Sequence, residues 1–478
     1  MSLNNKKVEE IKKWLCLAII LLPNLMISLN TYMLQVALPM IQKEIIASFS
    51  EAQMILSGYA LGLSATLIVC GKLGDLFGQK RLLKWGVIGF MLTAVLGSIA
   101  QSAWQLIFIR LLQGIFGACI QPQVLVLMRS NFKKEEHSLV FAIYGALTGI
   151  GFTFGLILGG LIMHLNLWNL SWRNIFLINI PFCFLILVGL GLVSESTNLK
   201  KDAIDYTGAI ILMIGVTLIA YELFYFKIRQ SASTSLLIIL CGIGMIGYFI
   251  KHEKRMVKLK KTVLLDMIIF KQVGFTWGLL TILAVYINMF GYFFLITYYS
   301  QWRLNYDVLL TSLVFLPLGI GFILSSLWSA KLLRLLQKKL LYLGVTLMLF
   351  SVLALSFWSY YYGELLTPVG LLALSGYGIG LGMSTTPLVG LVLNCLPFKF
   401  SGIGGGLLNT IMYFANMLGV CLIGIIFNYG INLLSVSEKS NNMAIQKSFS
   451  YSLLVVCIFI MLTQILVFLF FKKTENKL

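Results

Sequence analysis

Charged residues are scarce in this sequence of 478 residues, because they make up 11% of it, whereas soluble domains usually carry about 25%. Only 17 residues are acidic and three are histidine. The eight cysteines form no CxxC pair, and the histidines lack the spacing of metal ligands. No nucleophile–base pair and no phosphate-binding loop is visible. We therefore expect no enzymatic activity, no metal site and no cofactor.

Apolar residues, by contrast, make up 59% of the chain. Apolar stretches of 18 or more residues recur along its whole length, and each is a candidate membrane-spanning helix. The sequence predicts an all-α integral membrane protein with 14 spans. They lie at about 14–34, 51–71, 82–100, 104–128, 139–163, 173–193, 206–226, 234–250, 272–298, 308–330, 340–358, 364–394, 401–428 and 449–471.

The basic residues predict the orientation of the chain, because Lys and Arg are retained on the cytoplasmic side of a membrane. If both termini are cytoplasmic, the inside segments hold 28 Lys and Arg residues and the outside loops hold seven. We therefore expect a multi-pass protein of the plasma membrane with both termini inside. The net charge of +19 follows from this topology, so it indicates no nucleic-acid partner, although a basic face also favours anionic lipid.

The spans fall into groups of six, two and six. We predict five segments: a cytoplasmic N-terminus (1–13), a six-helix bundle (14–193), a linker with two inserted spans and a basic loop (194–271), a second six-helix bundle (272–471) and a cytoplasmic tail (472–478). A weak repeat relates GKLGDLFGQKRLL (71–83) to AKLLRLLQKKLL (330–341), which occupies the matching place in the second half. Related halves are typical of secondary transporters, whose substrate site lies between them.

The segment GKLGDLFGQKR (71–81) carries three glycines around one acid. The glycines allow a tight turn between helices, and Asp75 lies among basic residues where it can pair and face a helix N-terminus. The alternative is an ordinary positive-inside loop. The candidate switch residues are Gly71, Gly74, Asp75, Gly78, Lys80 and Arg81.

Arg110 lies inside the fourth predicted span. An Arg in hydrocarbon costs at least about 2.5–3.5 kcal/mol, so an intramembrane charge indicates a functional site. Gln113 follows three residues later on the same helical face. The alternative is an Arg whose charged end reaches the membrane surface.

The fifth predicted span contains GALTGIGFTFGLILGGLI (145–162), in which small residues recur four apart. Such residues let helices pack backbone to backbone in lipid, and a moving helix interface is compatible with this packing. The glycines of interest are Gly151, Gly155, Gly159 and Gly160.

These three segments, in this order, resemble the major facilitator superfamily, and the six-two-six layout resembles its fourteen-span drug:proton antiporter branch. Further pieces are similar to that branch: VALP (36–39), WRNIFLINIP (172–181), DYTG (205–208) and GGLLNTIMYFANMLGV (405–420). Tetracycline and multidrug exporters of Gram-positive bacteria are among its members.

The resemblance implies two six-helix bundles around a central cavity, alternating access, a bacterial source and a monomer. It implies that Asp75 and its loop stabilise closure on the cytoplasmic side. It also implies that Arg110 takes part in proton coupling and that the glycine helix is the antiporter-associated motif. Protons and a small amphipathic substrate are the implied partners.

Two departures concern proton coupling. The branch usually carries an acid six to nine residues before VALP, where this sequence has Asn30, and an amide takes up no proton at physiological pH. The branch usually has Pro after the middle glycine, where this sequence has Leu156. Glu222 is the one acid inside an apolar span, which makes it a candidate proton carrier, with a peripheral interface acid as the alternative.

Polar uncharged side chains inside spans predict the wall of the cavity, because such side chains normally face protein or water. Hydrogen bonds between helices are the alternative role. The candidates are Asn30, Tyr32, Gln35 and Gln113 in the first half, and Asn288, Tyr292, Asn409, Tyr413 and Asn416 in the second.

A cavity with one Arg and no central acid suits neutral, zwitterionic or anionic amphipaths. The sequence therefore predicts proton-driven efflux of drugs or amphipathic molecules. A facilitator or importer of a metabolite or siderophore, without proton antiport, is the alternative.

Overall fold

The computed structural model describes residues 2–195, 205–225, 232–259, 261–397, 400–437 and 440–474, which are largely helical and include no strand. Thirteen helices in these ranges are long and apolar enough to cross a membrane. A further apolar helix, α8 (Tyr206–Tyr225), coincides with the predicted seventh span. Every predicted span thus coincides with helix, which confirms the all-α membrane fold.

We call the helices before α8 the N-terminal bundle. They are α1 (Ser2–Glu44), α2 (Phe49–Phe77), α3 (Gln79–Ser98), α4 (Ala103–Asn131), α5 (His137–Leu165), α6 (Asn174–Leu177) and α7 (Asn179–Gly189). The inserted pair consists of α8 and α9 (Ala232–Lys258). The C-terminal bundle consists of α10 (Phe275–Trp302), α11 (Val308–Val314), α12 (Leu316–Leu336), α13 (Lys339–Tyr362), α14 (Pro368–Asn394), α15 (Ser401–Ser437) and α16 (Asn441–Thr474).

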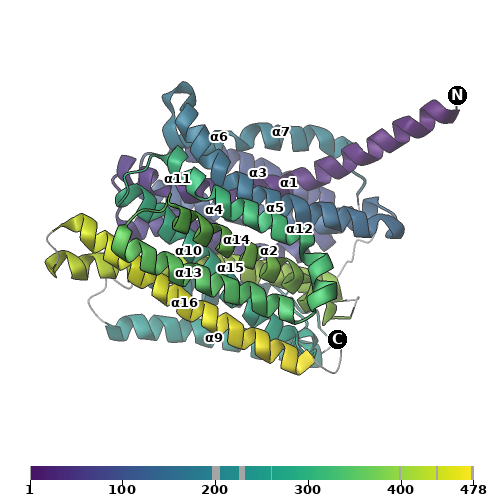
Figure 1. The fold of residues 1–478 in the computed structure, drawn as a ribbon. Coiled ribbons are helices and arrows are strands. Elements are labelled where there is room, and N and C mark those ends of the chain that lie inside the picture. Colours follow the sequence, from purple (N-terminus) through teal and green to yellow (C-terminus); the bar gives the residue numbers. More distant parts are fainter. Residues whose placement is uncertain are drawn as a thin grey trace.

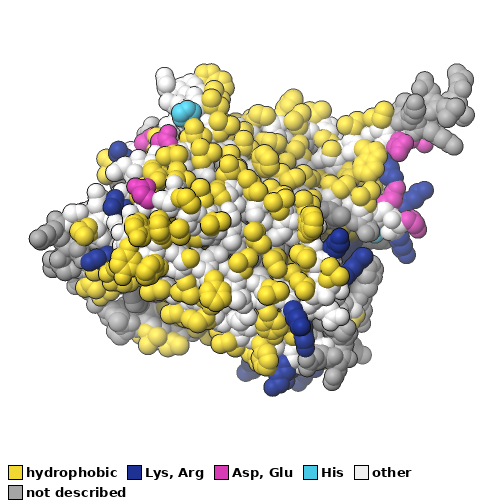
Figure 2. Space-filling view, in the orientation of Figure 1, with side chains coloured by type: hydrophobic (Ala, Val, Ile, Leu, Met, Phe, Trp, Pro, Cys, Tyr) yellow, Lys and Arg dark blue, Asp and Glu magenta, His cyan; other side chains and the backbone are white. Residues whose placement is uncertain are grey.

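The long helices run side by side, and α1 begins at the same end of the molecule at which α16 ends (Figure 1). We call this the terminal end. Apolar side chains cover the middle of the surface in Figure 2, as expected for contact with lipid, and many Lys and Arg side chains gather at the terminal end. This distribution agrees with the positive-inside pattern, while the side of the membrane that each end faces stays a prediction.

The two bundles meet along two seams. In one seam α2 packs against α15, and in the other α5 packs against α11 and α12. Hydrogen bonds join the bundles at the end opposite the termini, where the Tyr298 hydroxyl donates to Gln42 Oε1 at 2.9 Å and Gln301 Nε2 donates to the Val36 carbonyl at 2.8 Å. Phe49 packs edge-on against Tyr298 there, with ring centroids 5.2 Å apart. The bundles are therefore closed against each other at this end.

Contacts between the bundles are looser toward the terminal end. A Cβ built on Gly405 of α15 would find its nearest neighbour, Leu125 of α4, 4.0 Å away, and one on Gly406 would lie 3.9 Å from Leu67. Hydrogen-bonded contact at one end and more open packing of these glycines toward the other agree with one state in an alternating-access cycle.

The inserted pair lies outside both bundles, but α8 fills the outer groove of the α2–α15 seam. Val216 and Ala220 of α8 share an apolar cluster with Leu61 of α2 and Met417 of α15. Closer to the terminal end, a mainly apolar cavity of about 850 Å³ separates the pair from the seam. The pair therefore does more than link the bundles, because α8 bridges them.

Glycines allow α2 and α4 to come together inside the N-terminal bundle. A Cβ built on Gly62 would lie 3.2 Å from the Gly114 Cα, and one on Gly114 would lie 2.9 Å from the Leu63 nitrogen. Because both neighbours are backbone atoms, they cannot turn away as a flexible side chain would.

We expect Gly114→Leu to lower the free energy of unfolding by at least about 1–3 kcal/mol, the usual cost of overpacking. Thermal unfolding of the purified protein, followed by size-exclusion chromatography, measures this change. Gly244→Leu in α9 is the matched control, because a Cβ there meets nothing within 4 Å. Equal unfolding temperatures for the two variants would contradict the close helix contact.

Candidate functional site

Arg110 lies in the first third of α4 with a fully buried side chain. Its Nη1 donates to Gln113 Oε1 at 2.6 Å, and its Nε donates to the Ile55 carbonyl at 3.4 Å. The guanidinium lies over the ring of Tyr59 on α2, 4.3 Å from the centroid. Arg110 thus turns into the N-terminal bundle and does not reach for the membrane surface.

The charge of Arg110 has only neutral partners in the part of the chain that the structure describes, where Tyr59 is the one ionisable group that interacts with it. Burying an ion costs several kcal/mol after relaxation. A desolvated cation–π contact returns about 2 kcal/mol, and each hydrogen bond to a charged group about 1.5–3 kcal/mol. These contacts are comparable in size to the desolvation cost, but the Nη2 nitrogen of Arg110 is buried and has no hydrogen-bond partner.

Asn30 of α1 lies at the other end of Tyr59, whose hydroxyl faces the side chains of Asn30 and Thr31. Asn30 Oδ1 lies 3.4 Å from Asn179 Nδ2 of α7. The Asn179 nitrogen also donates to two carbonyls of its own helix, so the Asn30 oxygen is held on that side. The Asn30 nitrogen is left buried and unpaired.

The predicted residues Asn30, Gln113 and Arg110 are therefore brought together around Tyr59. Sequence reasoning missed Tyr59, because it stands in a long apolar span with no motif around it. Gln35, predicted alongside Asn30, is also buried, and its Nε2 is unpaired.

A second group of polar side chains lies where the bundles meet. Tyr32 is half-buried and stacks on Phe290 of α10, with centroids 5.8 Å apart and planes 7° apart. Gln121 Nε2 of α4 donates to the Tyr413 hydroxyl of α15 at 3.1 Å. Tyr32 and Tyr413 were predicted and both contact the other bundle, whereas Gln121 was missed.

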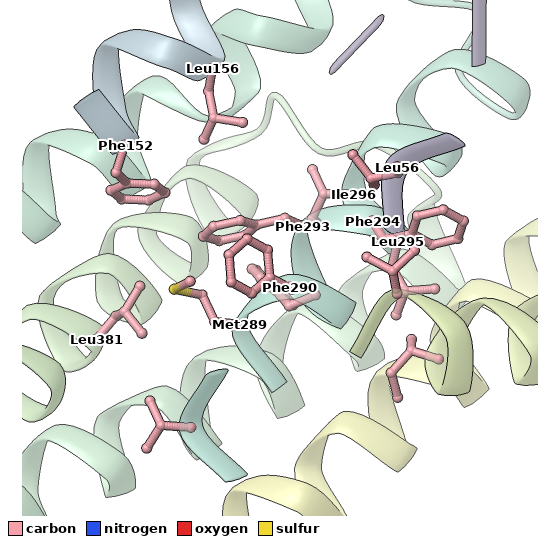
Figure 3. Packing of buried hydrophobic residues seen from close by; sticks show 14 of the residues in the cluster. Leu56, Phe152, Leu156, Met289, Phe290, Phe293, Phe294, Leu295, Ile296 and Leu381 are labelled. Atoms are coloured by element: carbon pink, nitrogen blue, oxygen red, sulfur yellow. The ribbon is translucent and has the colours of Figure 1, made fainter. Parts of the chain in front are cut away.

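Tyr144 of α5 and Tyr286 of α10 complete this group, because they interact with each other across the bundles and are both half-buried. Both were missed, since tyrosine is common in spans and neither belongs to a recognised motif. Beside them, Phe152 of α5 points toward Phe290 and Phe293 of α10 (Figure 3), and its ring lies 5.3 Å from that of Phe293.

The other residues predicted for the second half lie differently. The Tyr377 hydroxyl of α14 donates to Asn288 Oδ1 at 2.9 Å, and the Tyr377 ring stacks on Tyr292 at 4.1 Å. Asn288 and Tyr292 thus face a neighbour inside the C-terminal bundle. On α15, Asn409 is half-buried and Asn416 is buried.

Glycines press α5 against α1. A Cβ on Gly151 would lie 2.5 Å from the Ser28 Cβ, one on Gly155 2.9 Å from the Tyr32 Cβ, and one on Gly159 2.7 Å from the Met33 carbonyl. Gly160 instead faces α11, where its Cβ would lie 2.7 Å from the Val308 carbonyl of the other bundle. The glycines of α5 therefore make contacts both within the N-terminal bundle and between the bundles.

The 71–81 segment contains the turn between α2 and α3. Gly78 has φ +96° and ψ 133°, a conformation that glycine alone adopts without strain. The backbone nitrogens of Lys80 and Arg81 donate to the carboxylate of Glu195, at 2.9 and 3.3 Å. Glu195 thus faces the N-terminus of α3, a place for which Asp75 had been expected.

Asp75 accepts a hydrogen bond of 3.3 Å from Gln79 Nε2. Gly74, one residue earlier, is buried against Gln123 of α4, whose amide nitrogen lies 2.9 Å from the position of a Cβ, and Gly71 stands near Pro122. Glu195 was missed, because its role depends on the sixth span ending beside this turn.

Glu222 lies near the end of α8 and is fully buried, although Tyr221 beside it is 40% exposed. It belongs to the helix that covers the α2–α15 seam. Of the two residues predicted to take part in proton coupling, Arg110 lies on α4 of the N-terminal bundle and Glu222 lies on α8 of the inserted pair.

We expect Gly78→Ala to destabilise the protein by about 1–3 kcal/mol, the usual cost of a strained backbone conformation. Gly71→Ala is the control within the same motif, because its Cβ would make only an ordinary contact of 3.8 Å with Pro122. The thermal midpoint should fall for the first variant alone. Equal midpoints would show that the turn tolerates a side chain and that its backbone is not constraining.

The sequence profile of the Major Facilitator Superfamily matches residues 20–420. Among solved structures, a bacterial homolog of the human lysosomal transporter Spinster, in an inward-facing and unoccupied conformation, superposes with a TM-score of 0.69. It shares 13% identity, and the match covers 97% of this chain and 98% of that one. The fold likeness agrees with the observed bundles.

Three relatives in sequence are a probable actinorhodin transporter of Streptomyces coelicolor (26% identical, covering 87% of this chain and 72% of the relative), the drug efflux pump JefA of Mycobacterium tuberculosis (28%, 84% and 78%) and a tetracenomycin C resistance and export protein of Streptomyces glaucescens (25%, 87% and 76%). These findings confirm the resemblance predicted from the motifs. The chain belongs to the Major Facilitator Superfamily and is a multi-pass membrane transporter, not an enzyme.

Proposed function

We propose that the protein exports drugs or other amphipathic small molecules from a bacterial cell by alternating access, driven by the proton gradient. In this proposal it is a monomer in the plasma membrane with both termini in the cytoplasm. The observation that carries the proposal is a buried, partly unpaired cation inside the N-terminal bundle, next to a group of aromatic and amide side chains at which the two bundles meet. Relatives named as drug and antibiotic exporters support the direction of transport.

The substrate binds between the bundles, where Tyr32, Tyr413 and Phe290 offer aromatic surface and Gln121 offers an amide. Such walls suit the apolar body of an amphipath and fix it with few polar contacts. Arg110 does not contact the substrate in this proposal. Its charge acts on the substrate from behind Tyr59, which in turn interacts with Tyr413. A positive site with no acid beside it in the described part of the chain favours neutral, zwitterionic or anionic molecules over dications.

Conformational change opens the end where Tyr298 bonds Gln42 and Gln301 bonds Val36, and closes the terminal end. The 71–81 turn, stiffened by Gly78 and held by Glu195, stabilises the closed terminal end. The glycine contacts of α5 with α1 and α11 allow the helices to shift without side chains catching on one another.

Glu222 is the proposed proton carrier, because it is a buried acid on the helix that bridges the seam. Protonation removes the negative charge of the Glu222 carboxyl group. The free energy of keeping this side chain in a low-dielectric site changes as a result. Asn30 is the observation that favours the alternative, a facilitator without antiport, because a fixed amide stands where an acid would couple protons to Arg110.

In inverted membrane vesicles acidified inside, we expect a transported amphipath to dissipate the pH gradient only when the protein is present. Glu222→Gln should abolish this proton flux while leaving the protein folded. Glu135→Gln, an exposed acid between α4 and α5, is the matched control. Movement of the compound down its own gradient with no proton flux would support the facilitator instead.

We expect Arg110→Ala to reduce export of anionic amphipaths by about 10- to 100-fold, the effect of losing one charged interaction, and to leave dications nearly unaffected. Efflux rates for matched acidic, neutral and dicationic compounds measure this selectivity. Dication export that is lost in Asn30→Ala but persists in Arg110→Ala would contradict the proposed preference.

A further inference from the structure

The unpaired polar atoms around Arg110 can all donate a hydrogen bond, and the Tyr59 hydroxyl can also accept one. They are Arg110 Nη2, Gln113 Nε2, Asn30 Nδ2 and the Tyr59 hydroxyl, and each belongs to a side chain at most 1% exposed. They come from three helices, α1, α2 and α4. Buried polar groups are normally paired. The Tyr59 hydroxyl faces Asn30 and can accept as well as donate, but Arg110 Nη2 and Gln113 Nε2 have no acceptor among the described residues.

The orientations of the two amides are determined by their other partners. Gln113 must turn its oxygen to Arg110, because the guanidinium only donates, and its nitrogen is then left over. Asn30 must turn its oxygen to Asn179, whose amide nitrogen faces it. Flipping either amide would set donor against donor, so the excess of donors is a property of the residues and not of the way the amides are drawn.

A water molecule could pair some of these donors, but it brings no charge. The positive charge of Arg110 has no acidic partner within the described ranges, and its only ionisable neighbour there is Tyr59. A group that accepts several hydrogen bonds and carries negative charge meets both needs, since charge-assisted hydrogen bonds are the stronger ones.

We infer that the Arg110 cluster, formed by Asn30, Tyr59, Arg110 and Gln113, binds a monovalent anion. The anion is either a halide from solution or the acidic group of a transported amphipath, and both offer negative charge and hydrogen-bond acceptors to the donors of the cluster. The bound anion supplies the negative charge that an acid at position 30 would otherwise provide. An exchangeable anion then completes the Arg110 cluster.

The inference rests on the proposed function only for access to the site. Tyr59 interacts with Tyr413, which is half-buried at the meeting of the bundles, so an anion entering there lies one side chain away from the Arg110 cluster. Binding itself is measured without transport, so a failed transport assay leaves the binding result intact, and the reverse holds as well.

The test is thermal unfolding of the purified full-length protein in chloride, bromide or gluconate at equal ionic strength. We expect chloride or bromide to raise the midpoint by at least about 2 °C over gluconate, because a ligand of the folded state stabilises it. A second arm adds naphthoate in gluconate, with naphthalenemethanol as the uncharged counterpart. A halide shift assigns the anion to solution, and a shift with naphthoate alone assigns it to the substrate.

Asn30→Asp is the decisive variant, because it keeps the shape and the oxygen facing Asn179 while adding a fixed carboxylate. We expect it to unfold at a higher temperature than the wild type in gluconate and to lose the anion shift. Asn24→Asp on the same helix is the control, since its amide bonds Thr148 away from Arg110, and it should keep the shift.

Arg110→Gln should also lose the anion-dependent rise of the unfolding midpoint. If Arg110→Gln does not fold, Asn30→Asp alone still tests the inference. Equal wild-type midpoints in gluconate, halide and naphthoate would overturn the inference. An undiminished shift in Asn30→Asp would overturn it as well, because the anion would then be acting elsewhere.

Discussion

Helices inside a bilayer gain no hydrophobic free energy by meeting one another, because lipid tails are as apolar as their side chains. This constraint explains where the close contacts of the protein lie. Gly62 and Gly114 join α2 to α4, and Gly155 and Gly159 join α5 to α1, at positions where a Cβ would strike the neighbouring helix. Among the described residues, the bundles are joined by single side-chain hydrogen bonds, such as those of Gln301 and Tyr298, and not by a continuous glycine contact of this kind.

The same medium makes a buried charge expensive, and the Arg110 cluster shows how the chain meets that cost. An aromatic face, an amide and a carbonyl surround the guanidinium, but every partner among the residues that the structure describes is neutral. A site held this way is incompletely satisfied by its own residues. It therefore responds to what enters, which is useful in a transporter whose cycle must differ between loaded and empty states.

Much of the architecture could be predicted from the sequence, because length and hydropathy decide what crosses a membrane. The spans and the all-α membrane fold follow from apolar runs and short polar loops. Arg110 and the 71–81 turn were recognisable because a charge in hydrocarbon and three glycines around an acid are uncommon.

Residues that act through tertiary contact could not be predicted in this way. Tyr59 joins Asn30 to Arg110 only because α1, α2 and α4 converge, and no pattern in α2 marks it. Glu195 reaches the start of α3 from the end of the sixth span. Asn288 and Tyr292 resembled cavity residues by composition, yet both face Tyr377, because the rotation of a uniformly apolar helix is not encoded by its hydropathy.

The placement of α8 makes the two seams unequal. One seam carries a third helix along its outer groove, while in the contacts of the described helices the α5–α11/α12 seam has none. The α2–α15 seam is therefore reinforced by α8, whereas the seam at α5 is held by the two bundles alone. The bundles should then rotate about the α2–α15 seam. Any lateral opening between the cavity and the bilayer should form at the α5–α11/α12 seam. The transporter therefore presents two unequal sides to the surrounding lipid.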